Sequence, residues 1–277
     1  MRRILIALLL VLPLSAFTSA ERLFAPSADL WPRWQARGDG TAGRIDFSVW
    51  DALLGRVVLT RGDGINLVDY RALAGPQAAA LDSVVAGLAA VPVSRHDGDE
   101  QLAYWINLYN AVTLQVVARH YPVATIRDID ISPGWFADGP WDAALVTVEG
   151  EALTLNDIEH RILRPIWGDP RIHYAVNCAS LGCPNLAAEA YRGAQIDGQL
   201  AAAARAYINH PRGVSVEGEK VTVSKIYDWF LEDFGGSTEG VLAHLQRHAR
   251  PELAARLAAI GDIAGTAYDW GLNDTDE

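Results

Sequence analysis

The chain has 277 residues, half of them hydrophobic, and a formal net charge of −11. An acidic surface repels phosphate backbones, so the composition argues against nucleic acid as a partner. Nine tryptophans and the high apolar content exclude an intrinsically disordered chain and indicate a packed globule.

Residues 1–20 resemble a secretory signal peptide of the Sec type. Arg2 and Arg3 precede an apolar run at 4–14, and the small residues at 18–20 offer a cleavage point. The run is too short to span a bilayer, and no other segment has the roughly 20 apolar residues that a membrane helix needs. We therefore expect a periplasmic or secreted protein with no integral membrane segment after cleavage.

The remaining chain is predicted to hold one globular domain. We expect an irregular N-terminal arm at 21–45, the domain at 46–273 and an acidic tail at 274–277. Trp31 and Trp34 are expected to fix the arm to the domain.

The apolar spacing and turn residues predict a helix-rich domain. Hairpins are expected where β-branched residues flank a turn such as Glu149-Gly150, and helices where apolar residues recur every three or four positions. The fold class is therefore α+β, with a small, largely antiparallel sheet and a central apolar helix. The predicted helices are 47–59, 69–90, 99–121, 154–167 and 195–209, the hairpins are 144–155 and 213–224, and a single strand is expected at 171–177.

The helix at 99–121 should be central, because it carries apolar residues on nearly every side. Asn107 and Asn110 lie three residues apart and share one face of it. A buried amide without a partner costs a few kcal/mol, so each of these side chains needs one. The loop at 177–183 is the expected partner, although both amides could instead bond to the backbone of the core.

Cys178 and Cys183, in the stretch RIHYAVNCASLGCPNL at 171–186, are the only cysteines. In an exported protein, two nearby cysteines suggest a disulfide. Zinc held by both sulfurs with His160 or His173 is an alternative, but the spacing is not that of a paired zinc motif, and we predict no metal and no cofactor.

A catalytic thiol is the third interpretation, and it requires a base. In an extended strand Cys178 would face away from His173, which is five residues distant. His160 is the better candidate, with Glu159, Asn107 or Asn110 orienting its ring. We place His173, Asn177 and Cys183 in the surrounding binding region.

Several motifs together resemble the domain-of-unknown-function family 547 (DUF547). The resemblance extends from about residue 45 to 273, and it implies no settled activity. Plant members fused to coiled-coil or glutaredoxin-like segments hint at protein interaction or thiol chemistry, and serine at the position of Cys183 in some members makes Cys178 the more interesting thiol. The motifs are AYWINLYNAVTL at 103–114, LNDIEHRILR at 155–164, DPRIHYAVNCASLGCPNL at 169–186 and YDWGLN at 268–273.

Three functions remain open from the sequence. The first is a thiol-dependent hydrolase or acyl-transfer enzyme acting on amide bonds of a protein or of the cell wall, with Cys178 attacking and His160 as base. Oxyanion donors would be backbone N–H groups of 179–183 or the two asparagine amides. The second is a non-catalytic binding or scaffold module with a Cys178–Cys183 disulfide. The third is a thiol–disulfide exchange protein.

Overall fold

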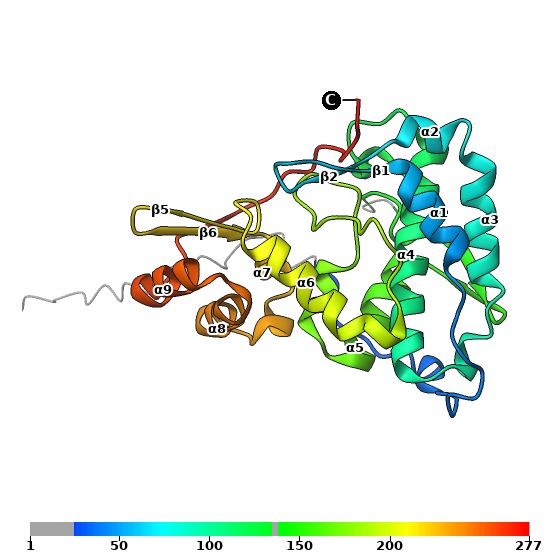
Figure 1. Cartoon of the computed structure of the whole chain (residues 1–277), viewed down its shortest axis with the longest axis horizontal. Coiled ribbons are helices and arrows are strands. Elements are labelled where there is room, and N and C mark those ends of the chain that lie inside the picture. The colour runs from blue at the N-terminus through cyan, green and yellow to red at the C-terminus, as the bar shows by residue number, and fades with distance from the viewer. Residues whose placement is uncertain (1–24, 135–137, 277) are drawn as a thin grey trace, which may run out of the picture.

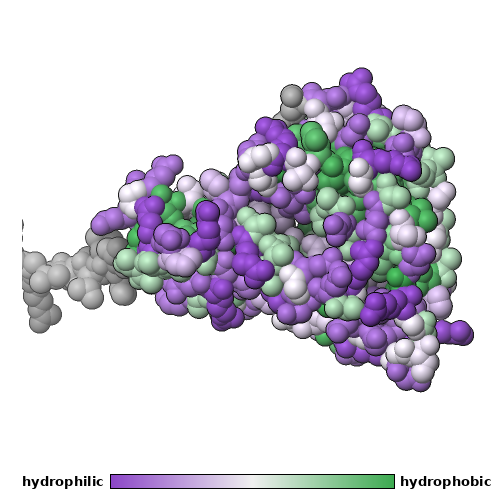
Figure 2. Space-filling model, viewed as in Figure 1, coloured by the Kyte–Doolittle hydropathy of each residue, from purple (hydrophilic) through white to green (hydrophobic). Residues whose placement is uncertain are grey.

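The computed structural model describes residues 25–134 and 138–276. Figure 1 shows a broad part, which contains α1 to α4, and a narrower part, which contains β5, β6, α8 and α9. On the face seen in Figure 2, hydrophilic and hydrophobic residues are interspersed.

Helices dominate the fold, and the strands form small separate sheets, which confirms the predicted helix-rich α+β class. Most strand pairs are antiparallel, and β6 pairs with β7 in parallel. The strands are β1 (Val58–Thr60) with β2 (Asn66–Val68), β3 (Val146–Val148) with β4 (Glu151–Leu153), and β5 (Val214–Glu217), β6 (Lys220–Ser224) and β7 (Gly265–Ala267). The main helices are α1 (Ser48–Val57), α2 (Tyr70–Ala74), α3 (Ala78–Ala89), α4 (Gly98–His120), α5 (Arg164–Trp167), α6 (Ile196–Ile208), α7 (Ile226–Trp229), α8 (Thr238–His248) and α9 (Pro251–Ile260).

Short turns of other helical types link these elements. A π-helix, η5 (Asp157–Leu163), leads directly into α5. The 3₁₀ turns are η2 (Pro32–Gln35), η3 (Val93–Arg95), η4 (Ile126–Asp128), η6 (Pro170–Tyr174), η7 (Gly193–Gln195) and η8 (Leu231–Phe234).

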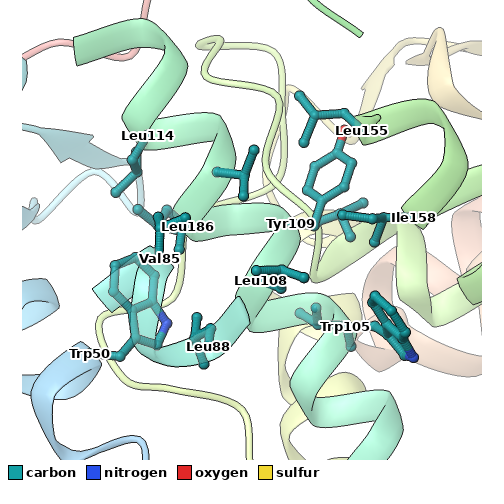
Figure 3. Packing of buried hydrophobic residues seen from close by; sticks show 14 of the residues in the cluster. Trp50, Val85, Leu88, Trp105, Leu108, Tyr109, Leu114, Leu155, Ile158 and Leu186 are labelled. Atoms are coloured by element: carbon teal, nitrogen blue, oxygen red, sulfur yellow. The ribbon is translucent and has the colours of Figure 1, made fainter. Parts of the chain in front are cut away.

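The central helix α4 is confirmed as the core of the broad part. Asp97 caps it by accepting hydrogen bonds from the backbone N–H groups of Asp99 and Glu100. Every residue from 100 to 118 is buried, so neighbouring elements cover all sides of the helix. Figure 3 shows Trp105, Leu108 and Tyr109 of α4 among the buried side chains of this cluster.

Two clusters of buried hydrophobic residues organise the chain. The larger surrounds α4, and the smaller joins α6, the β5–β6 hairpin, α7 and α8. Tyr174 belongs to the smaller cluster, whereas Ala175, Val176 and Ala179 belong to the larger one. The segment at 174–183, which contains both cysteines, therefore passes from the smaller cluster to the larger one.

Three elements differ from the sequence-based prediction. The strand expected at 171–177 is wrong: Pro170 begins η6, and the Asp169 side chain accepts from the backbone N–H of Arg171. The helix expected at 69–90 breaks between α2 and α3 at Gly75, because the residue before a proline disfavours the helical conformation. The loop at 61–65 connects two strands, β1 and β2, that were not predicted.

Trp34 fixes the N-terminal arm to the core. Its ring packs edge-to-face on Trp105, with the centroids 5.0 Å apart, and the side chain is buried.

We predict that Trp34→Ala lowers the free energy of unfolding by about 3 kcal/mol, because removal of a large buried ring leaves a cavity. Trp31→Ala, at a half-buried position, should cost less. Urea denaturation of both variants measures this, and equal losses would contradict it.

Candidate functional site

Asn110 of α4 holds the backbone that precedes Cys178. Its amide donates to the carbonyl of Ala175 at 2.9 Å, and its oxygen accepts from the N–H of Asn177 at 2.8 Å. Asn177 continues the chain of contacts by donating to the carbonyl of Pro184 and accepting from the N–H of Ala179. Because these groups are buried and paired, the cysteine loop has one defined conformation.

The C-terminal segment holds the other side of the loop. The N–H groups of Leu181 and Gly182 donate to the carbonyls of Gly271 and Asp269, each at 2.8 Å. Tyr207 of α6 donates to the carbonyl of Gly182 at 2.6 Å. Residues far apart in the sequence therefore converge on the segment between the two cysteines.

The two thiols face each other inside this loop. The Sγ atoms of Cys178 and Cys183 are 3.0 Å apart, and both cysteines are free. Cys178 is half-buried, whereas Cys183 is only 4% exposed. The backbone N–H of Cys178 also donates to the Cys183 sulfur at 3.1 Å. Cys178 is thus the less buried of the two cysteines.

Two hydroxyl groups complete the surroundings of Cys178. Tyr268 Oη lies 2.9 Å from Cys178 Sγ, and Ser180 Oγ lies 3.4 Å from it. These hydroxyls are themselves 2.9 Å apart. The Tyr268 ring packs against Trp229 and Trp270, with centroid distances of 4.8 Å to each.

The two thiols differ in acidity. The hydrogen bond with Cys183 lowers the pKa of Cys178, with burial opposing this shift and the hydrogen bonds with Ser180 and Tyr268 adding to it. Burial raises the pKa of Cys183 well above its usual value, and the hydrogen bond to Cys178 adds to this shift. The negative charge of Glu159 works against ionisation of Cys178. The pair therefore favours one thiolate, on Cys178.

Ala179, the residue after Cys178, has a left-handed backbone with φ of +59°. Such a conformation is uncommon for a residue with a side chain and costs of order 1 kcal/mol. The hydrogen bond from its N–H to Asn177 and the burial of its methyl group hold it there. The strained turn lies directly beside the half-buried Cys178.

The predicted base, His160, contacts Arg164 and makes no hydrogen bond to Cys178 among the described residues. Its Nδ1 is 3.0 Å from Nη1 of Arg164, one turn further along the chain. Burial lowers the pKa of His160 to about 4; the charge of Glu159 opposes this shift and that of Arg164 adds to it. Among the described residues, the side-chain hydrogen bonds of Cys178 go to Cys183, Ser180 and Tyr268, and none goes to a histidine.

Glu159 and His173 form a buried charged cluster with two residues that the sequence analysis did not select. His173 Nε2 lies 2.7 Å from Asp233, and its Nδ1 lies 3.6 Å from Glu159. Arg164 also pairs with Asp233, at 2.6 Å. Phe230 stacks on the imidazole of His173 with the ring centroids 4.3 Å apart.

The charges in this cluster stabilise one another. Burial disfavours charge on His173, yet its hydrogen bonds to Asp233 and Glu159 raise the pKa of the ring. Burial likewise opposes ionisation of Glu159, but His160, His173 and Arg164 lower its pKa to about 2. The two carboxylates therefore favour the charged form of His173, and this pairing suits a structural ion network better than a free base.

Asn107 has a structural role apart from the thiols. Its oxygen accepts from Trp50 Nε1 and from the N–H of Tyr191, and its amide donates to the carbonyl of Tyr191. Asn110 does reach the cysteine loop, as expected, whereas Asn107 bonds to the segment before α6. The structure thus groups Asn110, Asn177, Cys178 and Cys183, and places Glu159, His160 and His173 in a second cluster.

Most of the candidate oxyanion donors are already engaged. Four of the five backbone N–H groups in residues 179–183 donate to atoms of the protein, and that of Ser180 is the exception among these described residues. Both asparagine amides also have protein acceptors. In the described residues, no group of three or more histidine, cysteine, aspartate or glutamate side chains is arranged to hold a metal ion.

Residues 93–208 match the model of a family described as "Protein of unknown function, DUF547". The resemblance found in the sequence is thus confirmed over these residues. A search of curated proteins and a search of solved structures gave no match. Within 25–134 and 138–276, no helix has both the length and the apolar character to cross a membrane.

The acidity of Cys178 gives a testable expectation. We predict that alkylation of Cys178 by iodoacetamide has a pH midpoint below that of an ordinary thiol, because Cys183 donates to the thiolate. Cys183→Ala removes that donor and should shift the midpoint upward. Mass spectrometry of the modified peptide against pH measures both, and an unchanged midpoint in the variant would contradict the assignment.

The buried ion network predicts an acid dependence of stability. The pKa of Glu159 is depressed to about 2, so its contribution is present above the unfolded value and is lost as pH falls toward 2. Glu159→Gln should therefore flatten the decline in the free energy of unfolding between pH 5 and pH 2, by a few kcal/mol. Glu219→Gln, at an exposed position, should leave the decline unchanged. Equal behaviour of the two variants would refute the prediction.

Proposed function

We propose that this chain is a thiol–disulfide exchange protein in which Cys178 attacks and Cys183 resolves. The observation that carries the proposal is the 3.0 Å contact between two free sulfurs of unequal exposure. Opposite pKa shifts support the same division of roles, since the thiolate is the attacking species.

The exchange requires a disulfide as the second reactant. The Cys178 thiolate attacks one sulfur of that disulfide, a mixed disulfide forms, and the other sulfur leaves as a thiolate. Cys183 then loses its proton to solvent or to the departing thiolate and attacks Cys178 Sγ. The substrate leaves as a dithiol, and two electrons have passed from the cysteine pair to the substrate.

The surroundings of the sulfurs suit both steps. Closing the bridge needs the sulfurs to approach from 3.0 Å to about 2.05 Å, a movement that side-chain rotation can supply. Tyr268 and Ser180 can donate to the thiolate before attack. Asn110 keeps the backbone of the loop in place while the sulfurs change partners.

The proposed compartment agrees with this chemistry. We infer that residues 1–20 direct export, and disulfides form and persist in the periplasm and outside the cell. A substrate protein with an exposed disulfide is the class of partner that such a compartment provides.

A thiol-dependent hydrolase is the second candidate, and the strained Ala179 beside an acidic thiol favours it. It would use Cys178 alone, with His160 as the base and an amide bond of a protein or the cell wall as substrate. The engaged backbone N–H groups and the contact of His160 with Arg164 count against it. A scaffold role would instead keep the two cysteines joined permanently.

A trapping experiment separates these functions. On incubation with glutathione disulfide, Cys183→Ala should accumulate a mixed disulfide between Cys178 and one glutathione, with the other glutathione released as a thiolate, because the resolving thiol is missing. Cys178→Ala should accumulate far less of this adduct at the buried Cys183. Intact mass spectrometry reads the added glutathione. The unmodified protein should lose two mass units on oxidation and regain them with dithiothreitol.

Two outcomes would contradict the exchange proposal. One is a bridge that mild reductants fail to open without unfolding the protein, which would favour the scaffold role. The other is amide hydrolysis that persists in Cys183→Ala and disappears in Cys178→Ala, which would favour the hydrolase.

A further inference from the structure

A recess beside α8 has a charge that contrasts with the rest of the molecule. It has a volume of about 220 Å³ and is lined by Asp169, Pro170, Arg171, His244, Arg247 and His248. In a chain with a net charge of −11, a hollow with two guanidinium groups, two imidazoles and one carboxylate is unusual.

The carboxylate in this recess is already neutralised. Both oxygens of Asp169 accept from the guanidinium of Arg171, and the remaining Arg171 donor, Nη1, contacts Asp197. Arg171 is thus a fixed charge on the wall rather than a free donor. By contrast, Arg247 has no hydrogen-bond or ion-pair partner within the described part of the chain, and its guanidinium is exposed.

The two histidines occupy successive turns of α8, and their ring centroids lie 5.1 Å apart. His244 is buried, and its Nε2 lies 2.8 Å from the hydroxyl of Tyr174, which fixes the ring. His248 is half-buried, and its ring makes no hydrogen bond to another side chain among the residues that the structure describes. A free imidazole and a free guanidinium therefore line the same hollow.

Most of the charged groups that act on the two histidines are positive. Burial lowers the pKa of His248, and the charges of Arg171, Arg205 and Arg247 lower it further, against the single opposing charge of Asp169. Burial lowers the pKa of His244 to about 4, and His248 and Arg247 add to that shift. A bound anion would oppose these charges and raise the pKa of His248.

We propose that this recess binds a tetrahedral oxyanion of the phosphate class, held by Arg247 and His248. Guanidinium groups match such oxyanions through paired hydrogen bonds, and an imidazolium adds a charge-assisted donor. The site is independent of the cysteine pair, so it holds or fails whatever the thiols do.

Sulfate is the sharpest first probe, because it stays a dianion across the pH range in which histidine titrates. Calorimetry of the full chain with sodium sulfate, against sodium chloride at equal ionic strength, should show saturable binding. Arg247→Gln should weaken it about tenfold, since a charge-assisted pair is lost. Arg256→Gln, an exposed arginine on α9, is the matched control and should bind sulfate as the unmodified protein does.

Proton uptake gives a readout that a folding defect would not imitate. Near pH 6, sulfate binding should take up protons as the pKa of His248 rises, measured as a dependence of the binding heat on buffer ionisation enthalpy. His248→Asn should abolish most of this uptake while the circular dichroism spectrum stays unchanged.

Inorganic phosphate and phosphatidylglycerol vesicles then identify the source of the oxyanion. Binding of phosphate without sedimentation on vesicles assigns a soluble ligand, whereas vesicle binding that phosphate displaces assigns a lipid headgroup. No saturable binding of sulfate or phosphate, or equal weakening in Arg247→Gln and Arg256→Gln, overturns the proposal.

Discussion

The two hydrogen bonds between Asn110 and the backbone of Ala175 and Asn177 are the contact on which the site depends. They join the most buried helix of the fold to the segment that carries both thiols. Each bond is buried, so losing the amide would leave backbone groups unpaired at a cost of about 1–3 kcal/mol apiece. The loop can therefore hold a strained residue, Ala179, and a close sulfur contact at the same time.

The position of that loop between two hydrophobic clusters explains why its geometry is so constrained. Tyr174 packs with the smaller cluster, and the following residues pack with the larger one. The charged network of His173, Glu159 and Asp233 connects η6, the π-helix and η8. π-helical turns are rare and are often found at functional sites, and here the turn places both Glu159 and His160 inside the protein.

Much of the fold could be predicted from local patterns. The uninterrupted apolar surface of α4 predicts its burial, and the turn at Glu149-Gly150 predicts the β3–β4 hairpin. Thr154 and Asp157 form reciprocal hydrogen bonds at the start of the next helix, which was predicted at 154–167, but nothing in the sequence indicates its π geometry. The segment at 171–177 is not the predicted strand, because Pro170 and the Asp169 cap begin a 3₁₀ turn and the chain then passes between two cores, which apolar alternation alone does not indicate.

The site was harder to predict, because its parts come together only through tertiary contacts. Asn110, Cys178 and Cys183 could be selected from residue type and spacing. Tyr268 and Asp233 could not, since each lies at least 60 residues from its partner in sequence. YDWGLN, which begins with Tyr268, was visible as a motif, but nothing in its sequence indicates that the tyrosine hydroxyl reaches a sulfur.

The reduction potential of the Cys178–Cys183 pair is the most direct test of the central claim. The protein would be equilibrated in glutathione redox buffers, acid-quenched, and the fractions of dithiol and disulfide measured by mass. An exchange protein should have a potential between about −270 and −120 mV, the range of known thiol–disulfide catalysts. A value below about −300 mV would identify a structural bridge and contradict the account.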